Sequence, residues 1–174
     1  MADYSFGTLD LNNSNEIKLY EEEFYHAFAV KTNNTWVVNH NQKIGENRLR
    51  ANIPYDDQRI YTINYNHKLA AAAAVNIRCN SFQFEKKGFT LKNKTNICEG
   101  LNTFFTAHFP DSLFLELFGN FTDYMFSSLK KMGFDYFYGT ARKEMLNFYT
   151  LLGFEEVDQR IPEGIPYYLL KAKL

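Results

Sequence analysis

Hydrophobic and polar positions along the chain follow two different periods, and each period predicts one kind of element. Apolar side chains recur every three or four residues over residues 16–30 and again over residues 113–132, which predicts two long helices. Shorter runs rich in β-branched and aromatic residues predict strands at residues 4–9, 59–66, 69–78, 97–105, 155–160 and 167–173. The chain is therefore predicted to have a mixed α/β (α+β) fold.

Several segments between these elements have competing interpretations. Residues 36–38 are either a short strand or a second apolar element, and residues 39–57 form an irregular loop of the kind that often carries specificity. Residues 81–96 are predicted to be a polar connection around Gly88. Residues 113–118 could form a strand before a shorter helix, but one long helix over 113–132 is favoured because Glu116 would otherwise lie in a buried strand.

An acidic run, Glu21 to Glu23, lies within the first predicted helix. Such a run is typical of a solvated helix face close to the helix start, where the helix dipole favours negative charge. The alternative is a contact between these carboxylates and a bound amine.

The most informative stretch is FDYFYGTARKEMLNFYTLLGF, residues 134–154. Residues 134–138 are typical of a buried strand, and residues 143–152 place apolar side chains at helical spacing. Gly153 is the expected helix stop, and a strand-like run resumes at Phe154. Because a helix would join these two strands, parallel pairing between them is predicted.

Residues 147–154, NFYTLLGF, resemble the FYxxLGF signature of the GCN5-related N-acetyltransferase (GNAT) superfamily of acyl-CoA-dependent acyltransferases. With the preceding helix and strand, the resemblance covers about a third of the chain. It implies a GNAT-like acyl-CoA N-acyltransferase fold in a single domain over residues 1–174. Its central mixed sheet would be flanked by helices and splayed near residues 103–106. The alternative is that Phe148, Tyr149 and Phe154 are ordinary core aromatics.

Acyl transfer from a thioester to an amine needs an unprotonated amine, donors for the oxyanion and a proton for the leaving thiolate. No covalent intermediate is required, so the lack of a Ser-His-Asp or Cys-His pattern does not count against it. In the superfamily a tyrosine of the FYxxLGF helix often meets the thiolate, and Tyr149 matches that position. The alternative is a structural tyrosine whose hydroxyl satisfies a backbone carbonyl.

Glu99 is the second candidate catalytic residue, because it is the only carboxylate in the apolar run 97–101. Burial would raise its pKa toward that of a general base, whereas the competing account is a structural Glu paired with Arg78 or Arg142.

Residues 99–102 are also similar to the ExxR motif of acyl-homoserine lactone synthases and N-acyl amino acid synthases, which take acyl groups from acyl carrier protein. Asn102 stands where that motif has arginine.

The superfamily binds the donor's pyrophosphate on a Q/RxxGxG/A loop at a helix start, and this chain departs from it. The corresponding residues, 108–113, contain no glycine, but they include a proline and an aspartate. Either a protein carries the donor, or acyl-CoA binding has been lost. The resemblance assigns the pantetheine arm and the phosphate end of the donor to Thr103, Phe104, Phe105, Thr106, Phe109, Ser112, Leu113 and Asn147.

The alanine run 70–74 favours a helix by propensity, but the turn before it indicates a hairpin, so a strand is predicted. Its small side chains would leave room for an acyl chain; close packing of a helix is the alternative.

Composition narrows these possibilities. The chain has 174 residues, 17% of them aromatic, and a net charge of −1 without a basic cluster, which indicates a packed domain and neither a nucleic-acid nor a membrane surface. Cys79 and Cys98 lack metal-ligand spacing, so we expect no metal and two buried thiols, with a pairing left open. No signal peptide is recognised, which favours a cytoplasmic protein.

The sequence therefore predicts an N-acyltransferase that moves an acetyl or longer acyl group to a small-molecule amine, with acyl-CoA or acyl carrier protein as donor. The alternative is a non-catalytic binding module that keeps the fold but has lost the pyrophosphate loop. A third interpretation is an unrelated α/β enzyme in which FYTLLGF is a coincidence.

Overall fold

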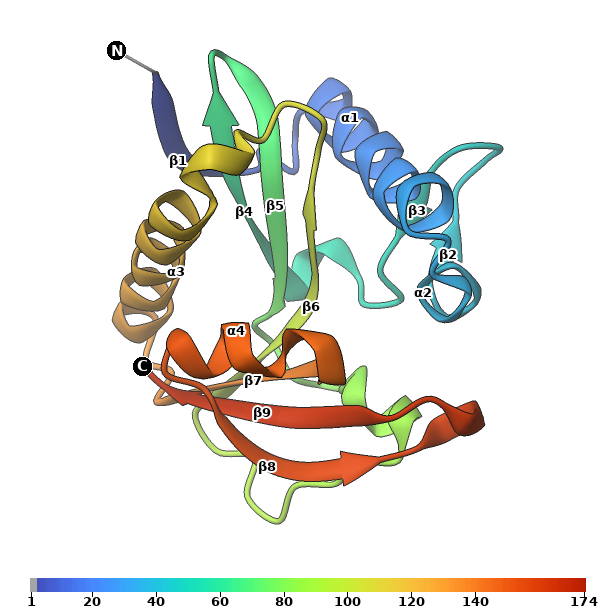
Figure 1. Cartoon of the computed structure of the whole chain (residues 1–174), viewed down its shortest axis with the longest axis vertical. Coiled ribbons are helices and arrows are strands. Elements are labelled where there is room, and N and C mark those ends of the chain that lie inside the picture. The colour runs from blue at the N-terminus through green and yellow to red at the C-terminus, as the bar shows by residue number, and fades with distance from the viewer. Residues whose placement is uncertain (1–2) are drawn as a thin grey trace. The chain divides into compact units, whose positions relative to one another are not determined.

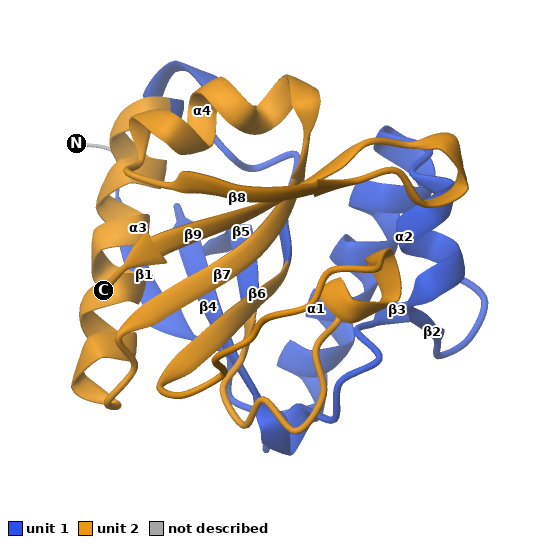
Figure 2. Cartoon of the chain, turned by 90° about the horizontal axis from the view of Figure 1, so that it is seen from below, with its two compact units in different colours: residues 1–74, 102–114 blue, residues 75–101, 115–174 orange. Residues whose placement is uncertain are grey.

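The computed structural model describes residues 3–174, and its elements can be followed in Figure 1. The chain divides into two compact units, each built from two segments (Figure 2). The first unit comprises residues 1–74 and 102–114, and the second comprises residues 75–101 and 115–174.

The described residues form four α-helices and nine strands, joined by short 3₁₀ or π-helical turns. The helices are α1 (Ser14–Tyr25), α2 (Thr35–His40), α3 (Phe114–Lys131) and α4 (Leu146–Leu151). The strands are β1 (Tyr4–Thr8), β2 (Gln42–Lys43), β3 (Leu49–Arg50), β4 (Gln58–Tyr65), β5 (Lys68–Asn76), β6 (Ile97–Phe105), β7 (Tyr136–Arg142), β8 (Glu155–Arg160) and β9 (Tyr167–Lys173). Seven strands follow the order β1-β4-β5-β6-β7-β9-β8, and β2 pairs only with β3. No helix among residues 3–174 is long and apolar enough to cross a membrane.

In the first unit, α1 covers the carboxyl-terminal part of β6. Asn13 caps the helix by accepting hydrogen bonds from the backbone amides of the first turn. Tyr20 and Phe24 then lie on one helix face and pack on Phe104, with ring centroids 5.6 and 5.7 Å apart. The predicted helix 16–30 is present, but its second half is the π-helical turn His26–Lys31, and residues 36–38 belong to helix α2.

Glu21 corrects the prediction of a solvated acidic face. Its side chain is fully buried, whereas Glu22 and Glu23 remain partly exposed. The Glu21 carboxylate accepts hydrogen bonds from Arg48, from Arg50 Nε at 3.0 Å and from the Tyr55 hydroxyl at 2.8 Å. A buried carboxylate needs such partners, and these hold the β3 segment on α1.

The alanine run lies in β5, as predicted. Ala70 to Ala74 are each at most 3% exposed, so the sheet pairing overrides their helix propensity. Their complete burial agrees with close packing, and the room for an acyl chain stays a prediction.

The second unit contains the only parallel pairing with a described register. β6 and β7 pair at Ile97–Tyr136, Cys98–Phe137 and Glu99–Tyr138, and the register goes no further. The intervening helix α3 packs on this pair through Phe126, whose ring lies 5.4 Å from that of Phe137. The long helix predicted over 113–132 is confirmed by α3.

The prediction of parallel pairing between the strands on either side of α4 is wrong. β9 lies between β7 and β8 and pairs antiparallel with both. The chain reverses after β8 through the turn Pro162–Gly164, so β9 can take the place next to β7. The parallel pair is instead β6 and β7, which α3 connects.

Candidate active site

Glu99 lies on β6 in the second unit and is 1% exposed. Its carboxylate accepts hydrogen bonds from the backbone amides of Gln83 at 2.9 Å and Phe84 at 2.7 Å, and from Asn76 Nδ2 at 3.2 Å. Burial raises the pKa of Glu99, while these donors and the charge of Lys87 act in the opposite direction. The competing account, a structural Glu99 paired with Arg78 or Arg142, stays a prediction.

The donors to Glu99 come from the segment that the sequence presents as a polar connection. Phe82, Phe84 and Phe89 are buried, and the 3₁₀ turn Phe84–Lys87 ends at Gly88, whose φ of 84° suits glycine. The turn aims two consecutive amides at one carboxylate. The prediction missed this burial, and the three phenylalanines are the sequence signal that could have revealed it.

Lys87 belongs to the same cluster and was not recognised from the sequence. Its side chain is buried, its Nζ donates to Thr140 Oγ1 at 2.6 Å, and it lies 4.8 Å from the ring centroid of Tyr167. Burial lowers the pKa of Lys87 to about 8, although the negative charge of Glu99 opposes the change and Arg142 reinforces it. A side-chain amine that titrates near neutral pH therefore lies in this unit.

Tyr149 lies on α4 and is partly buried between two aromatic rings. The ring centroids of Phe148 and Phe154 lie 5.6 and 5.3 Å from its own. Burial raises the pKa of Tyr149, and neither a hydrogen bond nor a neighbouring charge contributes to the change. The phenol is therefore protonated at neutral pH, and among residues 3–174 its hydroxyl has no partner, contrary to the backbone-bonded alternative.

The helix that carries Tyr149 ends as predicted. Gly153 adopts a left-handed φ of 83°, and the Phe154 amide donates back to the carbonyl oxygen of Tyr149 at 3.1 Å. Asn147 is exposed on the same helix, and Phe148 packs on Phe118 of α3 with centroids 5.2 Å apart.

The other predicted donor-binding residues belong to the first unit. Phe104 and Thr106 are buried, and the Thr106 hydroxyl donates to the carbonyl oxygen of Leu69 at 2.7 Å, which is a structural role. Thr103 and Phe105 alternate with them and are partly exposed. Phe105 contacts the ring of Phe109 at a centroid distance of 4.8 Å.

The loop expected to hold phosphate forms a 3₁₀ turn, Asp111–Leu113, after Pro110. Ser112 is exposed, and the Leu113 amide donates to the Pro110 carbonyl at 3.0 Å. The Phe109 amide is likewise used by the Thr106 carbonyl at 3.3 Å. Four residues of this loop thus offer no amide to an anion, because Pro110 has none and the amides of His108, Phe109 and Leu113 donate internally.

No family model matches the sequence, and no curated protein matches it. Solved structures match over nearly its whole length. The acyl-homoserine lactone synthase LasI gives a TM-score of 0.74 at 7% identity, covering 99% of this chain and 90% of LasI. MesI, a CoA-dependent acyl-homoserine lactone synthase, gives 0.74 at 9% identity, covering 98% and 88%. The ribosomal-protein-S18-alanine N-acetyltransferase from Escherichia coli gives 0.62 at 13%, covering 98% and 94%.

These structural matches establish the fold. The chain has the fold shared by the GNAT acetyltransferases and the acyl-homoserine lactone synthases, which confirms the prediction from FYxxLGF. The interpretation of that motif as a coincidence in an unrelated α/β fold is therefore wrong.

Proposed function

We propose that this protein is an N-acyltransferase, one domain over residues 1–174, that moves an acetyl or longer acyl group from a thioester to a small-molecule amine. The observation that carries the proposal is the fold, which matches an N-acetyltransferase and acyl-homoserine lactone synthases over 98–99% of the chain. Acyl-CoA is the favoured donor because MesI is described as CoA-dependent. Acyl carrier protein is the second donor to test.

In the proposed reaction, the amine attacks the thioester carbonyl, and the tetrahedral intermediate expels a thiolate that takes a proton. Tyr149 is the proposed acid. Its position in FYxxLGF, its raised pKa and the absence of an internal hydrogen-bond partner among the described residues support this role. A protonated phenol with no competing partner can donate to sulfur.

Glu99 is the proposed positioning residue. Three donors already occupy its carboxyl oxygens, which favours a fixed group that orients its neighbours over a freely exchanging base. Thr103 to Thr106, Phe109, Ser112, Leu113 and Asn147 are retained as proposed donor contacts, of which the partly exposed Thr103 and Phe105 and the exposed Ser112 and Asn147 are the more accessible.

The Tyr149→Phe variant tests the proposal. Thiol release from acyl-CoA should be measured against a panel of amines. We expect kcat to fall about a hundredfold, because general acid catalysis contributes roughly that much, while the melting temperature stays unchanged. Tyr136→Phe, on β7 of the same unit, is the control and should keep its activity. Equal turnover in wild type and Tyr149→Phe would contradict the acid assignment.

A second candidate function is a binding module without catalysis. The 3₁₀ turn after Pro110 favours it, because it replaces the glycine-rich loop expected to cradle pyrophosphate. The two candidates differ in one respect that is directly measurable, since a module would turn over no thioester with any amine.

A further inference from the structure

The first unit contains a cavity that none of the proposed acyl-transfer residues lines. Its volume is about 520 Å³, within the range typical of small-molecule sites. The wall residues come from α1, the end of β1, the hairpin of β4 and β5, and the loop after β6. They are Gly7, Thr8, Leu9, Glu16, Leu19, Glu23, Thr62, Asn64, His67, Lys68, Leu69 and His108.

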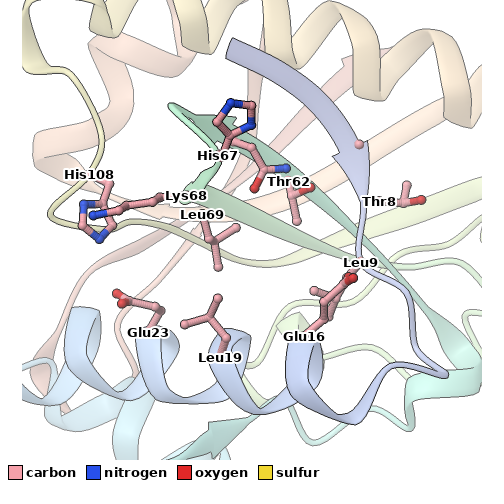
Figure 3. A pocket seen from close by; sticks show the side chains of 12 residues that line it. Thr8, Leu9, Glu16, Leu19, Glu23, Thr62, His67, Lys68, Leu69 and His108 are labelled. Atoms are coloured by element: carbon pink, nitrogen blue, oxygen red, sulfur yellow. The ribbon is translucent and has the colours of Figure 1, made fainter. Parts of the chain in front are cut away.

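Three ionisable side chains lie at one end of this cavity, next to apolar side chains. Figure 3 shows Glu23, Lys68 and His108 gathered at one end, with Leu19 and Leu69 in the middle. One carboxylate and one ammonium group thus lie beside the same apolar surface, on opposite walls: Glu23 comes from α1, and Lys68 comes from the hairpin.

The other two ionisable side chains of the cavity wall, Glu16 and His67, already have partners. Glu16 accepts hydrogen bonds from the Asp10 amide at 3.1 Å and from Asn13 Nδ2 at 3.0 Å, and His67 Nε2 lies 3.5 Å from Asp3 Oδ2. The Glu16 carboxylate therefore serves to fix the start of α1.

The side chains at the charged end differ from these. Within residues 3–174, the side chains of Glu23, Lys68 and His108 make no hydrogen bond and no ion pair with another residue. They do not neutralise one another, although all three line one cavity. A ligand with one group of each sign would gain both contacts at little desolvation cost, because the three side chains are still partly solvated.

The geometry points to a binding site for a small zwitterion with an apolar body, and free amino acids with apolar side chains are the class that fits. Its ammonium group would bind the Glu23 carboxylate, and its carboxylate would bind Lys68, with the His108 ring as a second donor. Leu19 and Leu69 would contact the apolar body. The site does not depend on the acyl-transfer proposal, because it uses residues of the first unit that take no part in that reaction.

Calorimetric titration of the whole protein, without any acyl donor, tests this site. Leucine and phenylalanine should bind, while leucinamide, which lacks the carboxylate, and N-acetyl-leucine, which lacks the ammonium group, should bind about tenfold more weakly or worse. Equal affinity for the zwitterion and both analogues, or no heat with any apolar amino acid, would overturn the proposal.

Substitutions of the charged side chains test whether the ligand binds in this cavity. Glu23→Gln and Lys68→Met should each weaken leucine binding about tenfold without changing the melting temperature, since neither side chain has an internal partner. Glu22→Gln is the matched control, because Glu22 is the adjacent acid on α1, faces Lys18 at 3.8 Å and does not line the cavity. Binding that is equally strong in all three variants would place the ligand elsewhere. Because no thioester is present, failure of acyl transfer leaves this result unaffected.

Discussion

Three ionisable side chains that the fold buries show how single residues acquire their properties here. Glu21 and Glu99 are accommodated in the interior because each carboxyl group accepts several hydrogen bonds, from arginines and a tyrosine in one case and from backbone amides in the other. Lys87 donates to the Thr140 hydroxyl and lies over the Tyr167 ring, and burial lowers its pKa to about 8. All three side chains are buried, and they differ in the kind of group that each one contacts.

Lys87 gives a pH-dependent prediction. Its pKa in the folded protein, about 8, lies below the ordinary value of 10.5, so between these values the unfolded chain binds more protons and stability rises with pH. Lys87→Met removes this dependence. Between about pH 7 and pH 9, the free energy of unfolding of the wild type should gain about 1 kcal/mol relative to the variant.

Guanidinium unfolding at both pH values measures that difference, and other groups that titrate in this range cancel between the two proteins. The exposed neighbour Lys86, replaced in Lys86→Met, serves as the control and should follow the wild type. If the free energy of unfolding depended on pH in Lys87→Met as it does in the wild type, burial of the Lys87 ammonium group would not destabilise the folded protein.

Among the elements, the junction of β6 and β7 is the most constrained. Their described register ends at Glu99–Tyr138, and the next residue of β6 is Gly100. The Phe137 ring covers this glycine, while Phe126 and Phe154 contact that ring at centroid distances of 5.4 and 5.8 Å. The Phe137 ring of β7 therefore packs over Gly100 of β6 and fills the space that a side chain at residue 100 would occupy.

Gly100→Ala tests this packing. A Cβ at this position would overlap the Phe137 ring, which its two aromatic neighbours hold in place, so we expect destabilisation of about 1–3 kcal/mol by chemical unfolding. Gly139→Ala is the matched control, because a Cβ there would lie 3.5 Å from the same ring, an ordinary contact. Adding Phe137→Leu to Gly100→Ala should recover part of the loss. If the two alanine variants were equally stable, the ring would not be the constraint.

At the scale of the whole molecule, the proposed function needs a thioester donor, while the loop at residues 108–113 offers fewer amides to the donor's phosphates than the superfamily pattern. The proposed acyltransferase and the binding module thus differ in whether an acyl donor binds, and a measurement of donor binding decides between them. A donor that reaches the protein mainly through its pantetheine arm would reconcile the two, since that contact does not need the missing glycines.

Donor binding can be followed by thermal unfolding with acetyl-CoA, long-chain acyl-CoAs and an acylated carrier protein. A donor present at about 100 times its Kd should stabilise the protein by about 2.7 kcal/mol. Free CoA, which keeps the phosphates but lacks the acyl group, is the control and should stabilise less. No shift with any acyl donor would favour the binding module over the enzyme.

The sequence alone determined features that depend on neighbours in the chain. Helix and strand periods are local, and so is the helix stop at Gly153, which let the long helix α3, the strand β6 and the FYxxLGF helix be predicted with nearly correct bounds. The same local pattern identified Glu99 as a carboxylate within an apolar strand, and its burial is confirmed. The fold class followed from these elements and the motif.

Tertiary structure decided every property that depends on residues far apart in the chain. The amides that hold Glu99 lie 16 and 15 residues before it, and Arg48 lies 27 residues beyond Glu21. The position of β9 between β7 and β8 likewise depends on which strand edge is available for pairing after the turn that follows β8. The burial of a side chain and its hydrogen-bond partners depend on which segments pack together in the folded protein. A hydrophobic period of two or 3.6 residues does not specify which segments those are.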